Sequence, residues 1–347
     1  MSNHVGFPVR ENPPLELPRT SVPVAAVITA HGRATYLEQA LDSVRAQTTV
    51  PAEVVVVDDT SPESNAPAIL RAVGVQSVRH ATSPNLARNA AILQVRQPWI
   101  AFLDADDLWL PHKLETQWRA VEACPDIGTV FTNLQEFNED GPLPTPFFER
   151  KPHYWVVDRQ EVAPGIKRCG HESLVRQFLL GNILWRSTLL VRRDLLVQVG
   201  LFDPELVHLE DRDCWLRLLT VSEMAVIEEP LMWSRTDDPA DATRRLWEYE
   251  TALDGIKLSE RILADPGRYP RGTMERYAVD RWRWHLNAGR FSEDQGDLAA
   301  ARRFYLQAWW LGGGLRPVLL AGSLHLPATL RRALKTAIRR SRRLAAA

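Results

Sequence analysis

Three aspartates follow a short apolar run in the stretch WIAFLDADDLW, residues 99–109. The apolar residues have the character of a buried strand, which stops at Asp104, Asp106 and Asp107. Two of these carboxylates would lie at the carboxyl end of a central strand, where open α/β sheets bind ligands. Nearby carboxylates repel unless a cation lies between them, and Mg²⁺ commonly uses one or two carboxylates plus substrate phosphates. The spacing predicts a metal and diphosphate site, with a solvated acidic turn as the alternative.

A second acidic pair, Glu210 and Asp211, opens the segment HLEDRDCWLRLL, residues 208–219. The apolar residues of this segment recur at helical spacing, so both acids fall at the amino end of a predicted helix. Acids at that position are favoured by the helix dipole and can act as caps. A carboxylate can equally serve as a general base. The residues alone leave both roles open.

The first hundred residues alternate between apolar runs and amphipathic segments. The runs VPVAAVIT (22–29), EVVVVDD (53–59) and VQSV (75–78) predict strands, and residues 36–47 and 86–95 predict helices. Strand, helix, strand is a parallel βαβ unit, which puts the strand tips on one edge of the sheet. A GxGxxG fingerprint does not follow the first strand, so a dinucleotide site is not expected. The pattern predicts an α/β fold with a mostly parallel, Rossmann-like sheet flanked by helices.

Composition narrows the class of protein. The 347 residues are 45% hydrophobic, which permits a substantial core, and the formal net charge is −1. A balanced charge argues against a nucleic-acid binder, because such proteins carry a basic surface. The three cysteines are too few and too widely spaced for a disulfide framework or a zinc motif, which favours the cytoplasm. A signal peptide pattern is not recognised at the N-terminus.

A family resemblance is carried by several segments together. The series VITAHGR, LDSVRAQT, EVVVVDDTS, LARNAA and FLDADDLWLPHKLE, in this order and spacing, resembles the family 2 glycosyltransferases of the GT-A fold. The matching segments span roughly residues 22–235. The resemblance implies a GT-A-type sheet that binds a nucleotide-sugar donor, with a UDP-sugar favoured.

The resemblance also assigns a donor site. Asp106 and Asp104 would hold Mg²⁺ or Mn²⁺, and Asp104 would also reach the sugar or ribose. His31 stands where the family usually has an aromatic residue, and Arg88 would contact phosphate or form an ion pair within the sheet. The predicted nucleotide-sugar-binding residues are Thr29, Ala30, His31, Arg33, Asp58, Asp59, Arg88, Asp104 and Asp106.

The same resemblance assigns the catalytic pair. Gly200–Asp203 matches a Gly-x-Phe-Asp sequence that precedes the family's Glu-Asp motif, which corresponds here to Glu210 and Asp211. Asp211, with Glu210 next, would accept the proton of the acceptor hydroxyl in a single displacement that inverts the anomeric carbon. The acceptor would be a glycan or a lipid-linked glycan for the cell surface. An aromatic insert at residues 146–158 predicts a hairpin, with core packing expected for its rings and acceptor contact as the alternative.

The C-terminal hundred residues change character. We expect an extended or disordered tail at 1–21, a GT-A domain at 22–242 and a helical region at 243–347 with a basic end. Two of the expected helices resemble a tetratricopeptide hairpin. Trp309, Trp310, the apolar run 318–326 and a basic helix at 330–343 resemble an interfacial anchor. This pattern favours peripheral contact with the inner face of the plasma membrane, with a solvated basic helix as the alternative. Nothing in the sequence specifies an oligomeric state.

Two alternatives use the same residues differently. A nucleotidyltransferase would use the same metal and nucleotide pocket but release pyrophosphate. A sensor or scaffold would bind sugar-nucleotides without catalysis and use the helical region to contact a partner.

Overall fold

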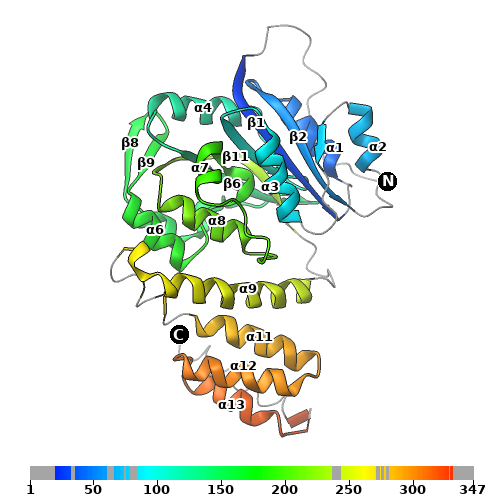
Figure 1. Ribbon diagram of the computed structural model, residues 1–347, viewed down its shortest axis with the longest axis vertical. Helices are drawn as coiled ribbons and strands as arrows, with labels where there is room; N and C mark the ends of the chain where they lie inside the picture. The colour runs from blue at the N-terminus through cyan, green and yellow to red at the C-terminus, as the bar shows by residue number, and fades with distance from the viewer. Residues whose placement is uncertain are drawn as a thin grey trace. The chain divides into compact units, whose positions relative to one another are not determined.

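The computed structural model describes residues 20–32, 36–60, 66–73, 76–78, 84–236, 244–270, 274, 277–278, 281–327 and 329–330 (Figure 1). Contacts among these residues form two units. The first runs to Glu205 and resumes at Glu210, and the second joins Leu206–Leu209 to the C-terminal helices. The tail predicted at 1–21, apart from its last two residues, and the basic helix predicted at 330–343, apart from Leu330, lie outside the described residues.

The first unit is built on one mixed sheet (Figure 1). Strands β3, β2, β1, β4, β6 and β11 run in one direction, and β10 runs against them between β4 and β6. The predicted α/β fold with a mostly parallel central sheet is therefore confirmed. The sheet order is β3 (Gln76–Val78), β2 (Val50–Thr60), β1 (Ser21–Gly32), β4 (Trp99–Asp104), β10 (Leu190–Arg192), β6 (Thr129–Asn138), β11 (Met224–Arg235), β9 (Ile166–Cys169) and β8 (Arg159–Ala163); β5 (Leu108–Trp109) pairs with β11, and β7 (Gly141–Pro142) with β6.

The predicted strand tips do meet at one edge of the sheet. In the β1–β2–β4 register, Thr29 lies opposite Asp104, Ala30 opposite Asp58, and His31 opposite Asp59. Residues 24–28 of β1 are fully buried, as expected of a central strand covered on both faces. The helices that pack against these strands are α1 (Leu37–Arg45), α2 (Ala66–Val73) and α3 (Pro84–Gln94).

The second acidic pair lies at the start of a helix, as predicted. Helix α7 (Arg193–Gln198) ends just before Gly200, whose φ of 88° is the left-handed conformation that glycine adopts most readily after a helix. Gly200 thus ends the turn that follows α7. Helix α8 (Glu210–Leu219) then buries Trp215 completely against Phe102 and Phe202, which fixes the helix on the sheet.

The hairpin predicted at 146–158 is wrong. This insert forms a short 3₁₀ helix η2 (Phe148–Arg150) and helix α5 (Pro152–Trp155), because Pro152 favours a helix start and Phe148 stacks on Tyr154 at 3.9 Å between ring centroids. The hairpin of this region is β8–β9, which is followed by α6 (His171–Leu180). Phe147, Phe148 and Tyr154 are buried, which confirms core packing for them, whereas Trp155 is 46% exposed.

Two further elements of the first unit matter for the site. Strand β10 is short, because a 3₁₀ turn η3 (Arg186–Thr188) precedes it. Helix α4 (Lys113–Ala123) follows the acidic stretch and packs on β6 and β11.

The second unit is helical, as its sequence predicted. It contains α9 (Arg244–Ala264), a 3₁₀ turn η4 (Pro266–Arg268), α11 (Trp282–Asp294), α12 (Leu298–Trp310) and α13 (Leu315–Ser323). Helices α11 and α12 pack closely: a Cβ on Gly289 would come within 2.7 Å of the Tyr305 ring, and the Tyr305 hydroxyl donates to Glu293 at 2.8 Å. Over the described residues, none of the helices combines the length and apolar character needed to cross a bilayer.

Candidate active site

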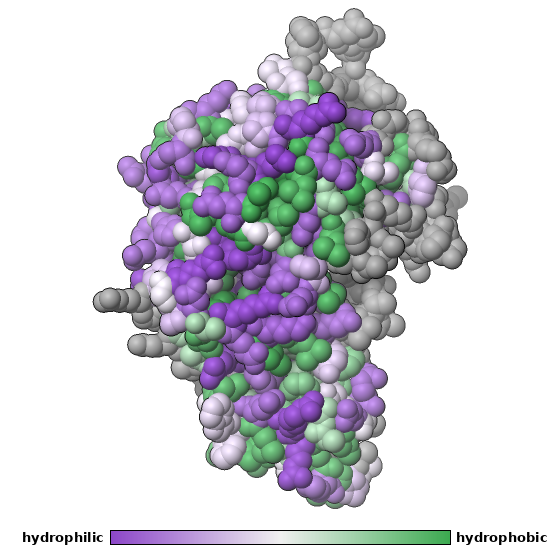
Figure 2. Space-filling view, in the orientation of Figure 1, coloured by the Kyte–Doolittle hydropathy of each residue, from purple (hydrophilic) through white to green (hydrophobic). Residues whose placement is uncertain are grey.

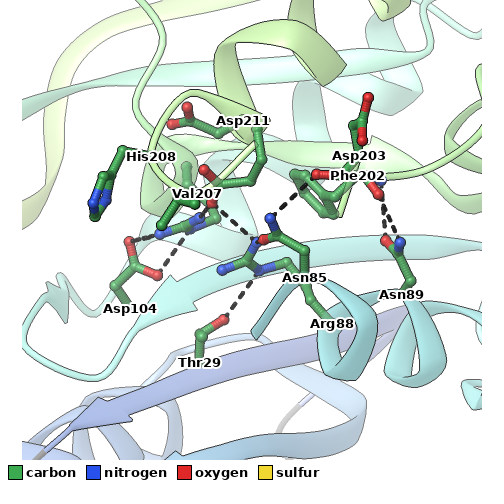
Figure 3. Close-up of polar contacts among 12 residues, drawn as sticks. Thr29, Asn85, Arg88, Asn89, Asp104, Phe202, Asp203, Val207, His208 and Asp211 are labelled. Atoms are coloured by element: carbon green, nitrogen blue, oxygen red, sulfur yellow. Dashed lines mark hydrogen bonds and ion pairs between the residues drawn. The ribbon is translucent and has the colours of Figure 1, made fainter. Parts of the chain in front are cut away.

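Asp104, labelled in Figure 3, forms the centre of a polar cluster together with Arg186. Asp104 ends β4, and Arg186 lies in η3, 82 residues further along the chain. Arg186 Nε lies 2.9 Å from Asp104 Oδ1, and Arg186 Nη2 lies 3.0 Å from Asp104 Oδ2. This is a bidentate pair, the strongest geometry for an arginine and a carboxylate. Both oxygens of Asp104 therefore accept hydrogen bonds from one guanidinium.

Glu210 joins the same cluster from the first turn of α8. Its Oε1 accepts from Arg186 Nη1 at 2.9 Å and from Arg88 Nη1 at 3.2 Å. The side chains of Glu210 and Arg88 are 7% and 3% exposed, so these ion pairs are almost dry. Glu210 is thus neutralised by two arginines from different parts of the chain.

The surroundings shift the pKa values of Arg186 and Arg88 in opposite directions. Burial alone would lower the pKa of Arg186, but the Asp104 and Glu210 carboxylates outweigh burial and raise its pKa above the usual range. Burial, and then the charge of Arg186, lower the pKa of Arg88, although Glu210 opposes both effects. Arg186 is therefore the more firmly held cation, and it links β4 to α8.

Helix α3 fixes the loop that leads toward α8. Asn89 donates from Nδ2 to the Phe202 carbonyl at 2.7 Å, and the Phe202 amide donates to Asn89 Oδ1 at 3.0 Å (Figure 3). Asn85 Nδ2 lies 3.3 Å from the Asp203 carbonyl and Asn85 Oδ1 accepts from Arg88 Nη1 at 2.8 Å. The Gly-x-Phe-Asp segment is thus tied by its backbone to the helix that carries Arg88.

Asp211 has a different environment from its neighbour Glu210. Its side chain is partly buried, and its Oδ1 accepts from the backbone amide of Arg212 at 2.6 Å. Burial, and then the charge of Glu210, raise the pKa of Asp211 to about 6, although Arg186 acts in the opposite direction. Among the described residues, Asp211 makes no ion pair with an arginine within 4.0 Å. Its carboxylate is therefore more basic than that of an ordinary aspartate.

The rest of the acidic stretch divides between a buried and an exposed carboxylate. Asp107 is buried, accepts from Ser187 Oγ at 2.6 Å and accepts from the Arg235 amide at 3.3 Å. Burial, followed by the charges of Asp106 and Asp104, raises the pKa of Asp107. Asp106 is exposed, and its backbone carbonyl accepts from Arg235 Nε at 3.2 Å. Asp107 therefore links η3 to β11, whereas Asp106 is an exposed residue.

The other predicted donor-site residues lie at the same edge of the sheet. Thr29 is buried, with its hydroxyl 3.5 Å from Arg88 Nε, and Asp58 is buried at the end of β2. Ala30 is fully buried, so neither its side chain nor its backbone is exposed at this edge. The side chains of His31 and Asp59, and all of Arg33, lie outside the described residues.

The structure therefore brings Thr29, Arg88, Asp104, Glu210 and Asp211 together (Figure 3). Sequence reasoning missed Arg186, which contacts two of them. No motif marks Arg186, because it lies before a short strand and its partners are 82 and 24 residues away. It also missed Asn85 and Ser187, which are polar but occupy ordinary helix and turn positions.

The carboxylates of this site fit a divalent ion only if phosphates and water supply most of its ligands. Asp104 is occupied by Arg186, and the described residues form no group of three or more His, Cys, Asp or Glu that could hold a metal. The exposed carboxylate of Asp106 is compatible with Mg²⁺, which often uses one or two carboxylates and takes its other ligands from phosphates and water. The residues thus fit an ion that arrives with a diphosphate.

Comparisons with known proteins bear on the family and the fold of this chain. Residues 25–183 match the family model described as Glycosyl transferase family 2. An uncharacterized glycosyltransferase of Rickettsia typhi is 28% identical over 244 residues, which cover 67% of this chain and 71% of that protein. The succinoglycan biosynthesis protein ExoO of Rhizobium meliloti is 37% identical over 125 residues, covering 34% of this chain and 35% of that protein.

A solved structure shows the same fold. The mannosyltransferase PcManGT of Pyrobaculum calidifontis, in complex with GDP-Man and Mn²⁺, superposes with a TM-score of 0.53 at 17% identity, covering 90% of this chain and 83% of that one. The strands that carry Thr29 and Asp104 lie within the residues that match the family model. Residues 25–183 therefore carry the sequence features of the family 2 glycosyltransferases, and the first unit has the GT-A-type fold of the mannosyltransferase.

Proposed function

We propose that this enzyme transfers a sugar from a nucleotide-sugar to a hydroxyl group by a single displacement, with Asp211 as the general base. The observation that carries this proposal is the contrast between two adjacent carboxylates. Glu210 is buried and paired with Arg88 and Arg186, whereas Asp211 has a pKa raised to about 6. A base with a pKa near the working pH is best suited to accept a proton in the transition state.

The displacement follows from this assignment. The acceptor oxygen attacks the anomeric carbon as Asp211 takes its proton, and the bond to the nucleoside diphosphate breaks on the opposite face. One base and one leaving group on opposite faces of the sugar imply inversion at that carbon. Glu210 and its arginines would hold the first turn of α8 in place rather than accept the proton.

The donor would bind at the carboxyl ends of β1, β2 and β4, with a UDP-sugar favoured. A divalent ion, Mg²⁺ or Mn²⁺, would be held by Asp106, with Asp104 beside it, and would supply charge neutralisation at the departing diphosphate. The mannosyltransferase with the same fold was solved with GDP-Man and Mn²⁺, so GDP-sugars belong in the test. The proposed donor residues are Thr29, Ala30, His31, Arg33, Asp58, Asp59, Arg88, Asp104 and Asp106.

The acceptor would be a glycan or a lipid-linked glycan in cell-surface polysaccharide synthesis. The relative ExoO, named for succinoglycan biosynthesis, supports this class of product. We take residues 22–242 as the catalytic domain and 243–347 as a helical appendage in the cytoplasm.

Peripheral contact with an anionic membrane through the appendage is part of the proposal. Residues 298–347 contain ten Lys and Arg residues and no Asp or Glu. Trp309 and Trp310 are 48% and 80% exposed at the end of α12, and Figure 2 shows apolar patches among the charged side chains of this unit. Exposed aromatic residues and cations together suit a lipid interface.

The membrane proposal is tested by co-sedimentation with vesicles of phosphatidylcholine alone or with phosphatidylserine, at low and high salt. We expect binding only to the anionic vesicles at low salt, and weaker binding of W309A/W310A. Equal recovery of wild type and W309A/W310A with anionic vesicles would exclude the tryptophans from the contact.

The proposed activity is tested with a nucleotide panel. Thermal shifts with UDP, GDP, CDP and ADP, each with and without Mn²⁺, should single out one nucleotide whose stabilisation needs the metal. The matching nucleotide-sugar should then release a nucleoside diphosphate, slowly with water alone and faster with a glycan acceptor. Release of pyrophosphate would support a nucleotidyltransferase, and binding without turnover would support a sensor.

A further inference from the structure

Helix α9 of the second unit carries a buried acid, Asp254, with unusual partners. Its side chain is 2% exposed, and its Oδ2 accepts from two successive backbone amides, Val207 at 2.6 Å and His208 at 2.7 Å. Its Oδ1 lies 3.5 Å from Nζ of Lys257, whose side chain is 48% exposed. A buried carboxylate is costly unless hydrogen bonds satisfy it, so these amide contacts stabilise its placement.

A second contact fastens the same segment to the same face of α9. His208 Nε2 lies 2.8 Å from Glu250 Oε2, and Glu250 precedes Asp254 by one helical turn. Leu206 is fully buried. The four residues Leu206–Leu209 accordingly belong to the helical unit, although the chain on both sides of them belongs to the sheet unit.

Residues 206–209 directly precede the helix that carries the proposed base. Helix α8 begins at Glu210, immediately after Leu209, and Asp211 is its second residue. The amides held by Asp254 therefore lie three and four residues before the proposed base. A displacement of about 1 Å at a reacting group can lower a rate by roughly 10²-fold.

We propose that Asp254 is a positioning residue, which fixes the loop 206–209 so that the first turn of α8 presents Asp211 to the acceptor hydroxyl. This inference rests on the proposed function.

The test is a double-mutant cycle of Asp254→Ala with Asp211→Asn, measured by release of UDP from UDP-glucose and UDP-N-acetylglucosamine and of GDP from GDP-mannose. We expect D254A to lower kcat roughly 10–100-fold with little change in the KM for the donor. In the D211N background, D254A should lower kcat by less than about 3-fold, because Asp254 acts through Asp211. An independent, additive loss in the double mutant would overturn the proposal.

Two further variants test whether D254A loses activity merely because it misfolds. Asp254→Asn retains an oxygen that accepts from both amides, so it should recover most of the kcat that D254A loses. Glu260→Ala removes an exposed acid elsewhere on α9 and should leave kcat unchanged. If D254N is as impaired as D254A while E260A is normal, the charge rather than the loop contact matters, and the proposal fails.

Hydrogen exchange provides a readout that does not depend on turnover. D254A should accelerate exchange of the amides of residues 207–212 while leaving those of β1 and β4 as in the wild type. Faster exchange in this segment with undiminished kcat would show that the anchoring is irrelevant to catalysis. Wild-type activity in D211N would instead contradict the proposed base, which separates the two failures.

Discussion

Arg186 holds Asp104 in a bidentate ion pair, with Nε and Nη2 at 2.9 and 3.0 Å from the two carboxylate oxygens. The remaining nitrogen of Arg186, Nη1, lies 2.9 Å from Glu210. One guanidinium thus joins the acid at the end of β4 to the acid at the start of α8. The relative position of these two elements depends on Arg186, and the following predictions start from it.

Replacing Arg186 by alanine should destabilise the protein strongly. Two carboxylates would lose their shared cation in a largely buried cluster, in which Glu210 is 7% exposed and Asp104 20% exposed. Removing one partner of a buried ion pair typically costs about 3–5 kcal/mol. R186K should recover part of this loss, because lysine restores the positive charge but not the bidentate hydrogen bonds of the guanidinium. Urea denaturation measures both changes.

The matched control for Arg186 is Arg192→Ala. Arg192 pairs with Asp194, but their side chains are 39% and 60% exposed. Exposed pairs contribute about 0–1 kcal/mol, so R192A should have nearly wild-type stability. Equal losses of stability in R186A and R192A would contradict the structural role of the buried cluster.

Asp211 should control the acidic limb of the pH–rate profile. Its pKa is raised to about 6, first by burial and then by the charge of Glu210, so the basic form is lost as pH falls through 6. The kcat/KM of the wild type should therefore fall about tenfold per pH unit below this value. D211N should lower kcat/KM by roughly 10²–10⁴-fold and abolish this limb.

Glu210→Gln serves as the comparison for the pH profile. It removes charge from a residue already paired with Arg88 and Arg186, so we expect lower stability but a retained acidic limb. If E210Q lost the limb while D211N kept it, Glu210 would be the base.

The same pKa shift predicts that D211N is more stable than the wild type at neutral pH. The unfolded chain ionises Asp211 near pH 4 and the folded protein near pH 6, so the folded state binds the proton more tightly. Wild-type stability therefore falls as pH rises from about 4 to 6, and asparagine removes this penalty. We expect D211N to gain about 1–3 kcal/mol at pH 7.5 and nothing at pH 3.5.

Denaturation with urea at both pH values measures this difference. The gain in stability should accompany the loss of activity, as expected where a functional carboxylate is held in an unfavourable site. A D211N protein that is less stable than the wild type at pH 7.5 would show that the charged form is favoured by folding.

Asp106 and Asp104 should respond oppositely to mutation. Asp106 is exposed, so D106N should leave the stability of the free protein within about 0.5 kcal/mol but abolish metal-dependent stabilisation by the nucleotide. D104N should lower stability without any ligand, because it breaks the bidentate pair with Arg186. Thermal shifts with and without Mn²⁺ and the selected nucleoside diphosphate distinguish these effects.

Mn²⁺-dependent stabilisation that survives in D106N would move the metal site away from Asp106. Asp140→Asn, an exposed acid in a turn of the same unit, is the control and should bind nucleotide and metal as the wild type does.

The sequence by itself determined the strands and helices near the site and the strand and helix ends at which the carboxylates lie. Hydrophobic runs of the right length placed Asp104 at the end of β4, and apolar spacing placed Glu210 and Asp211 in the first turn of α8. Gly200 after α7 was readable because a left-handed residue at that position favours glycine. These features depend on residues close together in the chain, so local pattern was enough. The insert at 146–158 was misread, because stacking of Phe148 on Tyr154 decided its helical turns.

Only the tertiary structure decided which charges meet. Arg88 and Glu210 are 122 residues apart, and Arg186 and Asp104 are 82 residues apart, yet they share one buried cluster. The structure also separated Asp211 from its neighbour, since burial and the charge of Glu210 raise its pKa while two arginines neutralise Glu210. Likewise, the bond from Asp254 to the loop before α8 joins residues 46 and 47 positions apart. Ion pairing and desolvation depend on distance and burial in space, and neither is encoded in local spacing along the chain.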